Sequence, residues 1–230
     1  MQYLWDGIQQ AFLQILSGDH EVMQATLRTI WISGTAVLAA SVFGIPIGMC
    51  LARTRFPLRH TLLQAFRIGM ALPTVFIGII CFAMFSRQAP LGPLNILYTP
   101  WAIMVGEFLL ALPIIVSLTQ GAIQSLDRRI SETAKMLGAG RLLRWRTSLS
   151  EARIGISLAI LTAFSRCVTE LGIAMMVGGN IKDRTRTLST ATAMETGKGE
   201  FSDGLAMGVI LLGIAMIVTL TIGRLIRDDE

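Results

Sequence analysis

Three ionisable side chains, Glu107, Arg166 and Glu170, lie inside long apolar stretches of the sequence. Charges in such stretches are rare, and they are usually functional or paired. Arg166 and Glu170 are four residues apart, so on a helix they share a face and can form an ion pair. The planar guanidinium of Arg166 also presents a fork of donors that suits an anion. Two interpretations stay open: Arg166 is a transient stop for a passing anion, or it is locked in an internal ion pair. The glutamates favour the ion pair, because they repel anions.

These charges are not accompanied by a catalytic constellation. The lone Gly-Lys pair, Gly197-Lys198, has Thr192 where the nucleotide-binding Walker A motif needs glycine. HExxH, GxSxG and CxxC strings are missing from the sequence. His20 and His60 lie outside the apolar stretches, which argues against haem ligation within them. The sequence therefore predicts a chain that is not an enzyme.

The composition is typical of a protein in a lipid bilayer. Of the 230 residues, 53% are hydrophobic and 15% are charged, and the mean hydropathy is +0.61. Each charge placed in hydrocarbon costs about 2.5–3.5 kcal/mol on insertion scales. The net charge of +5 does not indicate nucleic-acid binding, because the basic residues separate apolar blocks and form no patch interleaved with aromatic residues.

Five apolar blocks are long enough to cross a membrane as helices, since about 20 helical residues span the hydrocarbon core. They cover residues 27–52, 66–86, 101–120, 152–178 and 205–226. The sequence therefore predicts an all-α membrane protein in which residues 19–230 form one transmembrane domain.

Prolines fall inside three of these blocks, at Pro46, Pro73 and Pro113. Each proline removes a helical hydrogen bond, so we expect kinks at these positions. Kinked helices that line a pathway and ordinary packing of a helix bundle explain the prolines equally well.

Residues 1–18 have a different pattern. Leu4, Ile8, Phe12 and Leu16 recur at every fourth position, and polar residues occupy many of the positions between them. This periodicity is typical of an amphipathic helix that lies along the membrane interface. A short helix packed on the bundle is the alternative.

Arginine and lysine residues are distributed unevenly between the connections, and cytoplasmic loops carry the excess of such residues. They are concentrated between the first two blocks, in the connection 124–151 and at the C-terminus. This distribution predicts a multi-pass inner-membrane protein with its N-terminus outside and its C-terminus in the cytoplasm. At about 1.5 Å of rise per residue, Arg166 then lies near mid-membrane. Glu107 and Glu170 lie nearer the outer side, where we expect them to flank Arg166.

The connection 179–200 is an exception, because it carries basic residues on the predicted outer side. An anionic substrate is one explanation, and a solvated loop whose charge is offset by neighbouring acids is the other. The stretch is also rich in hydroxyls and glycine amides, which hydrogen-bond an oxyanion without holding it tightly. A gate or pathway lining is the functional interpretation and a plain connecting loop is the alternative. The candidate residues are Asn180, Arg184, Arg186 and Thr187.

The connection 124–151 is longer than a minimal turn and predicts two short helices. Ser131 is a candidate cap for the first helix. Gly138 and Gly140 follow that helix, and glycine tolerates the left-handed backbone that a helix end needs. Two short helices joined at glycine predict a compact knob on the cytoplasmic side.

Within this connection, Glu132, Thr133 and Ala134, followed by three residues and Gly138, resemble the EAA motif of ABC importer permeases. In that family the motif forms a coupling helix that docks in a groove of a cytoplasmic ATPase. The family pattern continues with Ile-x-Leu-Pro where this chain has Ser148-Leu149-Ser150-Glu151, so we expect the returning helix to differ locally. The resemblance assigns ATPase coupling to Glu132, Thr133, Ala134, Leu137, Gly138 and Ala139.

The resemblance extends along most of the chain to the tungstate-type branch of the oxyanion permeases, to which molybdate and sulfate permeases are related. It is carried by Gly44–Gly48, Ala71–Pro73, Pro90–Gly92, Leu112–Ile115, Met175–Ile181 and Arg184–Ala191. It implies a type I ABC importer permease fold and a tetrahedral oxyanion as cargo, with tungstate first and molybdate or sulfate as alternatives. The competing interpretations are a permease for another solute, such as an amino acid, and a passive channel.

The same resemblance implies the partners. Five spans are few for a complete pathway, which implies a homodimer. A cytoplasmic ABC ATPase dimer, which carries ATP and Mg²⁺, drives transport, and an extracytoplasmic oxyanion-binding protein delivers the cargo. For this chain itself we expect no bound cofactor and no metal.

Overall fold

The computed structural model describes residues 5–6, 8–9, 12–13 and 20–227. Its ordered elements are all helical in the described part of the chain, which confirms the predicted all-α class. In chain order they are α2 (His20–Arg53), α3 (Arg59–Met70), α4 (Thr74–Phe85), the 3₁₀ turn η1 (Gly92–Leu94), α5 (Pro100–Ser125), α6 (Arg128–Met136), α7 (Arg141–Glu151), α8 (Arg153–Val168), the π-helical turn η2 (Ala174–Gly178), α9 (Leu188–Lys198) and α10 (Phe201–Arg227).

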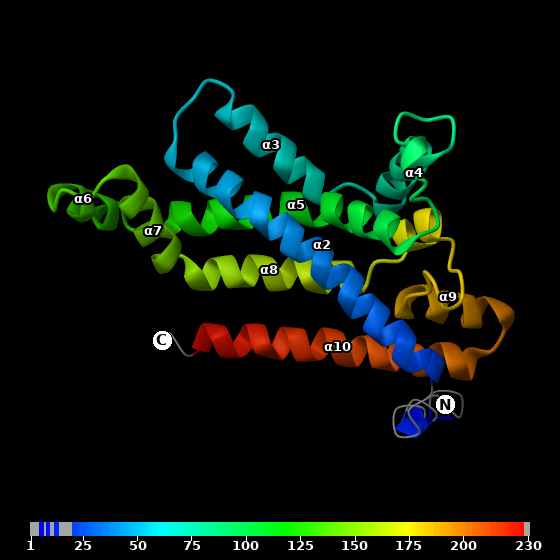
Figure 1. Ribbon diagram of the computed structural model, residues 1–230. Coiled ribbons are helices and arrows are strands. Elements are labelled where there is room, and N and C mark those ends of the chain that lie inside the picture. The colour runs from blue at the N-terminus through cyan, green and yellow to red at the C-terminus, as the bar shows by residue number, and fades with distance from the viewer. Residues whose placement is uncertain (1–4, 7, 10–11, 14–19, 228–230) are drawn as a thin grey trace.

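Three of these helices, α2, α5 and α10, are each long and apolar enough to cross a membrane, and α3 and α4 together make a fourth candidate. In Figure 1, α2 runs obliquely across α5 and α8, while α3 lies on one side of the bundle and α10 on the other. The main core is formed by residues from α2, α4, α5, α8 and η2. The architecture is therefore a bundle of apolar helices, as the composition predicts.

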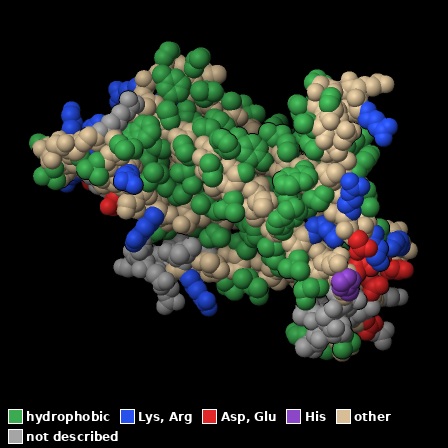
Figure 2. Space-filling model, viewed as in Figure 1, with side chains coloured by type: hydrophobic (Ala, Val, Ile, Leu, Met, Phe, Trp, Pro, Cys, Tyr) green, Lys and Arg blue, Asp and Glu red, His purple; other side chains and the backbone are tan. Residues whose placement is uncertain are grey.

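The bundle is apolar on its surface as well as in its core. Leu38, Val42 and Phe43 on α2 are 65%, 68% and 58% exposed. Figure 2 shows hydrophobic side chains across the middle of the visible face, with most Lys and Arg side chains toward its two ends. This arrangement matches a surface that faces lipid between two polar layers.

Helices α2 and α5 approach closely because glycines face α5 from α2. A Cβ atom at Gly44 would lie 2.9 Å from Ile115 Cγ2, and one at Gly48 would lie 2.9 Å from both Thr119 Cβ and the backbone oxygen of Val116. Such distances leave no space for a side chain. Small residues permit this close backbone contact, which is how helices associate in lipid.

The kink expected at Pro73 is confirmed, but it is a complete break, so residues 66–86 belong to two helices and not to one continuous helix. Helices α3 and α4 are bent by 101° across Ala71, Leu72 and Pro73. Proline has no backbone N–H, and its ring disfavours helical geometry at the residue before it. Pro73 adopts an extended conformation with ψ 128°. Pro46 and Pro113, by contrast, lie inside continuous helices.

The predicted fourth block, 152–178, is also divided, because α8 ends at Val168 and η2 follows. Thr169 donates its hydroxyl back to the carbonyl of Ser165 at 3.0 Å. One carboxylate oxygen of Glu170 accepts the backbone N–H of Ile173 at 3.0 Å. Glu170 thus caps a new helical turn that continues into η2, and this local hydrogen bonding replaces the continuation of α8.

The predicted interfacial helix over residues 1–18 is described at a few positions. Residues 5–6, 8–9 and 12–13 are helical, and Trp5 and Phe12 are 63% and 64% exposed. The other positions, including Leu4 and Leu16 of the proposed apolar face, lie outside the described residues. Its place at the membrane interface stays a prediction.

The contact between α2 and α5 is tested by replacing Gly48 with alanine. We expect Gly48→Ala to lower the free energy of unfolding by about 1–3 kcal/mol, as overpacking does in other cores. The matched control is Gly34→Ala in the same helix, where a Cβ would meet nothing within 4 Å. Unfolding is measured in detergent, and equal stability of the two variants would contradict the packing described here.

Candidate functional site

Residues 124–151 form two short helices that stand at one end of the bundle, as the sequence predicts (Figure 1). Helix α6 is capped by Asp127, whose carboxylate accepts the backbone N–H of Arg129 at 2.9 Å. The predicted cap, Ser131, is wrong, because this residue lies inside α6. Asp127 meets the free N–H groups at the helix start, and its charge opposes the positive end of the helix dipole. We call α6 and α7 together the knob.

Gly138 ends α6 in the left-handed conformation, with φ +78°. The N–H of Ala139 donates to the carbonyl of Ala134 at 2.9 Å, and the N–H of Gly138 donates to that of Lys135 at 3.0 Å. These two bonds form a Schellman motif, which satisfies carbonyls that the helix end leaves free. The predicted glycine stop is confirmed at Gly138, whereas Gly140 has φ −64° and is the N-cap of α7.

The knob presents apolar side chains to its surroundings. Met136 and Leu137 are 90% and 83% exposed, and Leu142 and Leu143 are 72% and 56% exposed. A groove beside them is lined by Thr133, Ala134, Leu137, Gly138, Ala139 and other residues of both helices. Gathered exposed apolar residues are typical of a surface that binds another protein or a membrane. The predicted coupling residues are thus at the surface: Ala134 and Ala139 are half-buried, and Glu132, Thr133, Leu137 and Gly138 are exposed.

Side chains of α7 anchor the knob to the bundle. Trp145 and Leu149 of α7 pack against a core cluster that contains Met49 of α2, Ile123 of α5 and Ile156 of α8. Ala152 is both the C-cap of α7 and the N-cap of α8. The knob is therefore packed directly against three helices of the bundle.

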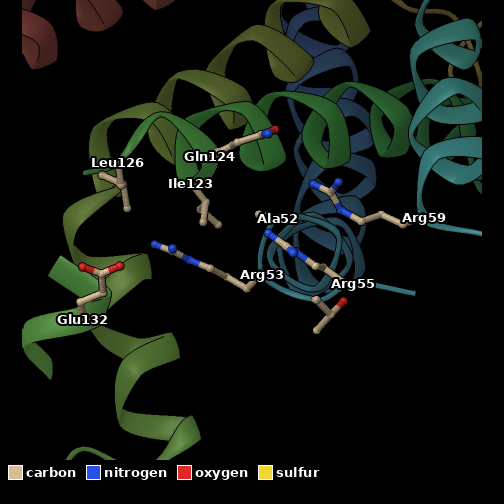
Figure 3. Close-up of a pocket in the computed structure, with 9 residues that line it drawn as sticks. Ala52, Arg53, Arg55, Arg59, Ile123, Gln124, Leu126 and Glu132 are labelled. Carbon is tan, nitrogen blue, oxygen red and sulfur yellow. The ribbon is translucent and has the colours of Figure 1, made fainter. Parts of the chain in front are cut away.

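A pocket of about 510 Å³ lies at the base of the knob (Figure 3). It is bordered by the end of α2, the start of α3, the end of α5 and Glu132 of α6. Arg53, Arg55 and Arg59 line it. In the sequence these arginines indicated membrane orientation only. Their close spacing was also a sign that they could share one site.

The predicted ion pair between Arg166 and Glu170 is present, with Nη1 and Oε2 3.3 Å apart. Their environments differ, because the side chain of Arg166 is 46% exposed and that of Glu170 is 1% exposed. Arg166 lies in the last turn of α8, where its charge also faces the negative end of the helix dipole. The arginine is thus held in place but remains accessible.

Glu107 lies on α5 and is buried. Its Oε2 atom has no hydrogen-bond partner among the described residues. The thiol of Cys167 contacts the backbone oxygen of Glu107 at 3.7 Å, so α5 meets α8 at the residue next to Arg166. Glu107 and Arg166 therefore lie on two helices that pack against each other. The carboxylate that pairs with Arg166 in the described structure is that of Glu170.

The hydroxyls of the predicted outer pathway segment hold its own backbone. Thr187 caps α9 in a reciprocal arrangement with Thr190, and both residues are buried. The N–H of Leu188 donates to the hydroxyl of Thr29 on α2 at 3.0 Å. The hydroxyl of Thr185, which is fully buried, donates to a carbonyl of the same segment at 2.7 Å. The bond to Thr29 fastens the segment to α2.

Two charged residues of this segment, Lys182 and Arg186, contact the start of α2. Glu21 forms an ion pair with Arg186 and another with Lys182, whose Nζ lies 2.7 Å from Glu21 Oε2. The hydrogen bond to Glu21 raises the pKa of the Lys182 ammonium. Arg184 is exposed, and Asn180 adopts a left-handed conformation with φ 48°. Sequence spacing gave no sign that Glu21 is the partner of Lys182 and Arg186.

The candidate pathway residues thus form two groups. The first lies where α5 meets α8 and comprises Glu107, Arg166 and Glu170. The second lies between η2 and α9 and comprises Asn180, Arg184, Arg186 and Thr187. The groups meet where the hydroxyl of Ser189 donates to the backbone oxygen of Glu170 at 2.7 Å. Sequence spacing carried no signal for this contact.

Known proteins resemble this chain over nearly its whole length. It is 33% identical to the tungstate uptake system permease protein TupB of Campylobacter jejuni, covering 99% of this chain and 95% of that protein. It is 31% identical to TupB of Peptoclostridium acidaminophilum, covering 96% and 97%. A solved inward-facing structure of the MetNI methionine ABC transporter superposes with a TM-score of 0.76 at 18% identity, covering 91% of this chain and 96% of that one.

These similarities agree with the geometry. The structural likeness confirms the predicted permease fold, and the relatives confirm the resemblance to the tungstate-type branch. Residues 44–228, which include the knob and both groups of candidate pathway residues, match a family of transport proteins. The chain therefore belongs to the family described as the inner membrane component of binding-protein-dependent transport systems.

Proposed function

We propose that the chain is the membrane-spanning subunit of an ATP-driven importer for a tetrahedral oxyanion, with tungstate as the first candidate and molybdate and sulfate as alternatives. The observation that carries the proposal is the glycine-capped knob with exposed apolar side chains at one end of an apolar bundle. The cargo is inferred from the two tungstate uptake permeases that it resembles.

In this proposal the knob is the surface on which a cytoplasmic ABC ATPase dimer docks, and ATP and Mg²⁺ are bound by that partner. The residues of the knob that contact the ATPase are Glu132, Thr133, Ala134, Leu137, Gly138 and Ala139. Support comes from the Schellman motif, which stiffens the end of α6, and from the anchoring of α7 on α2, α5 and α8. A stiff, anchored element passes the closure of a partner to the bundle as a rigid-body movement.

The proposed orientation places the knob and the C-terminus in the cytoplasm and the N-terminus outside. It is supported by the excess of arginines around the knob and the pocket at its base. Two copies of the chain form the pathway, and an extracytoplasmic oxyanion-binding protein delivers cargo to the outer side.

We propose that cargo passes Arg166. The half-exposed guanidinium has donors left beside the one that meets Glu170, and a fork of donors suits a tetrahedral oxyanion. Glu107 and Glu170 keep the binding weak by repulsion, which a pathway needs because its cargo must also leave. Asn180, Arg184, Arg186 and Thr187 form the outer part of the same route, where Arg184 is the exposed cation.

Coupling through the knob is tested by replacing Gly138 with valine. A β-branched residue in the left-handed region costs of the order of 1–3 kcal/mol, which distorts the end of α6. We expect Gly138→Val to lower ATP-dependent uptake by about tenfold with normal membrane levels.

The control for this variant is Gly140→Val, at a glycine two residues further along the knob. A Cβ meets nothing within 4 Å at either glycine, but Gly140 has an ordinary φ of −64°. We expect uptake and ATPase association near the wild-type level in Gly140→Val. A passive channel is indicated if neither variant changes uptake, and the coupling role is wrong in that case.

The role of Arg166 is tested with a single and a double variant. We expect Arg166→Gln to abolish uptake and to lower stability, because it leaves the buried Glu170 unpaired. In Arg166→Gln/Glu170→Gln we expect stability to recover, because the amide oxygen introduced at position 170 still accepts the N–H of Ile173, while uptake stays lost. Recovery of uptake in the double variant would show that the pair is a structural lock.

The identity of the cargo is tested by competition in vesicles that contain the permease, its ATPase and its binding protein. We expect unlabelled tungstate to inhibit uptake of labelled tungstate at lower concentration than molybdate, and sulfate to be weakest. Inhibition by an amino acid but by no oxyanion contradicts the proposed cargo without affecting the coupling mechanism.

A further inference from the structure

Arg53, a partly buried cation, lines the pocket at the base of the knob. The Nε and Nη2 atoms of Arg53 are buried and have no hydrogen-bond partner among the described residues. A guanidinium stays charged in proteins and presents five N–H donors, so it cannot remove the mismatch by losing a proton. Buried charged donors need an acceptor. A ligand with acceptor atoms in this pocket would satisfy these donors.

Two further guanidinium groups share this space. Figure 3 shows Arg53 at the end of α2, Arg55 in the turn that follows and Arg59 at the start of α3, all along the border of the pocket. The Nε of Arg59 donates to the backbone oxygen of Leu51 at 2.7 Å, which holds that side chain against α2. Three guanidinium groups thus line one pocket, and Glu132 is the carboxylate among its lining residues. The pocket thus has an excess of positive charge.

We propose that this pocket binds a tetrahedral oxyanion of the phosphate class, separately from the transport pathway at Arg166. Guanidinium groups bind such anions in a bidentate manner, and several of them together neutralise a dianion. The volume of about 510 Å³ accommodates the anion with water around it. The shared chemistry has two sources: a free oxyanion, or the phosphate of a lipid headgroup at the end of α2.

The position of the pocket connects its occupant to the knob. Glu132 lies on α6, whereas Arg53 ends α2 and Ile123 and Leu126 come from the end of α5 and the turn after it. An anion between them screens the attraction of the arginines for Glu132. Occupancy therefore changes the electrostatic force between the knob and the bundle.

Binding is tested with the purified permease in nonionic detergent after removal of lipid, with inorganic phosphate as the probe. The Tm is measured against phosphate concentration, and sodium chloride keeps the ionic strength constant. A ligand that binds the folded state raises the Tm in a saturable way. We expect such a rise for the wild type.

Three variants define the site. We expect half-saturation to move to at least about tenfold higher phosphate in Arg53→Gln, since one charge-assisted donor group is lost. Arg55→Gln removes an exposed side chain and serves the same purpose if Arg53→Gln does not fold. The control Arg87→Gln lies outside the pocket, in the connection after α4, and should respond as the wild type does.

The source of the anion is distinguished by repeating the titration in nanodiscs that contain phosphatidylglycerol. A free oxyanion is supported if phosphate still raises the Tm there, and a lipid headgroup is supported if the response is lost because lipid fills the pocket. The proposal is overturned if the wild type in detergent shows no saturable rise. It is equally overturned if both pocket variants respond like the wild type. These measurements use the permease alone, so they are independent of uptake.

Discussion

The close contact between α2 and α5 is the constraint on which the rest of the structure depends. Apolar helices gain little from leaving lipid, because lipid tails are as apolar as leucine side chains, so association relies on tight packing. Gly44 and Gly48 let the backbone of α2 approach α5 with no side chain between them. Helices α4 and α8 and the turn η2 then complete the core around this pair. The ends of α2 and α5 also border the pocket beneath the knob, so the same contact positions the functional end.

The membrane helices and the knob were predictable, because few other structures explain their residues. Charge-free runs of about 20 residues have little use outside a bilayer, and Gly138 follows a short polar helix at the position where a left-handed residue is needed. The two broken blocks were harder to predict. At Pro73 the sequence indicated a kink within one apolar block, whereas the structure has a bend of 101° between two helices. The break after Val168 depends on hydrogen bonds of Thr169 and Glu170 that compete with the helix.

The least predictable features were those that join distant parts of the chain. Sequence spacing indicated the pair of Arg166 with Glu170, because the two residues are four positions apart. It carried no sign that Ser189 contacts Glu170, or that Glu21 contacts Arg186, because each pair is brought together by the packing of separate helices. The arginines near the end of α2 likewise indicated orientation but not a shared pocket. Helix α2, which is about 51 Å long by its 34 residues, links both regions: Glu21 is at one end and Arg53 at the other.

The shortness of α8 has a consequence for the polar groups that follow it. Its 16 residues span about 24 Å, whereas the hydrocarbon layer is about 30 Å thick. Helix α8 alone is therefore too short to cross that layer. A crossing built on it must include the segment after Val168, where Thr169 returns its hydroxyl to the backbone and the backbone oxygen of Glu170 accepts the hydroxyl of Ser189. These local bonds supply partners that hydrocarbon cannot, so an interrupted helix is tolerated at membrane depth.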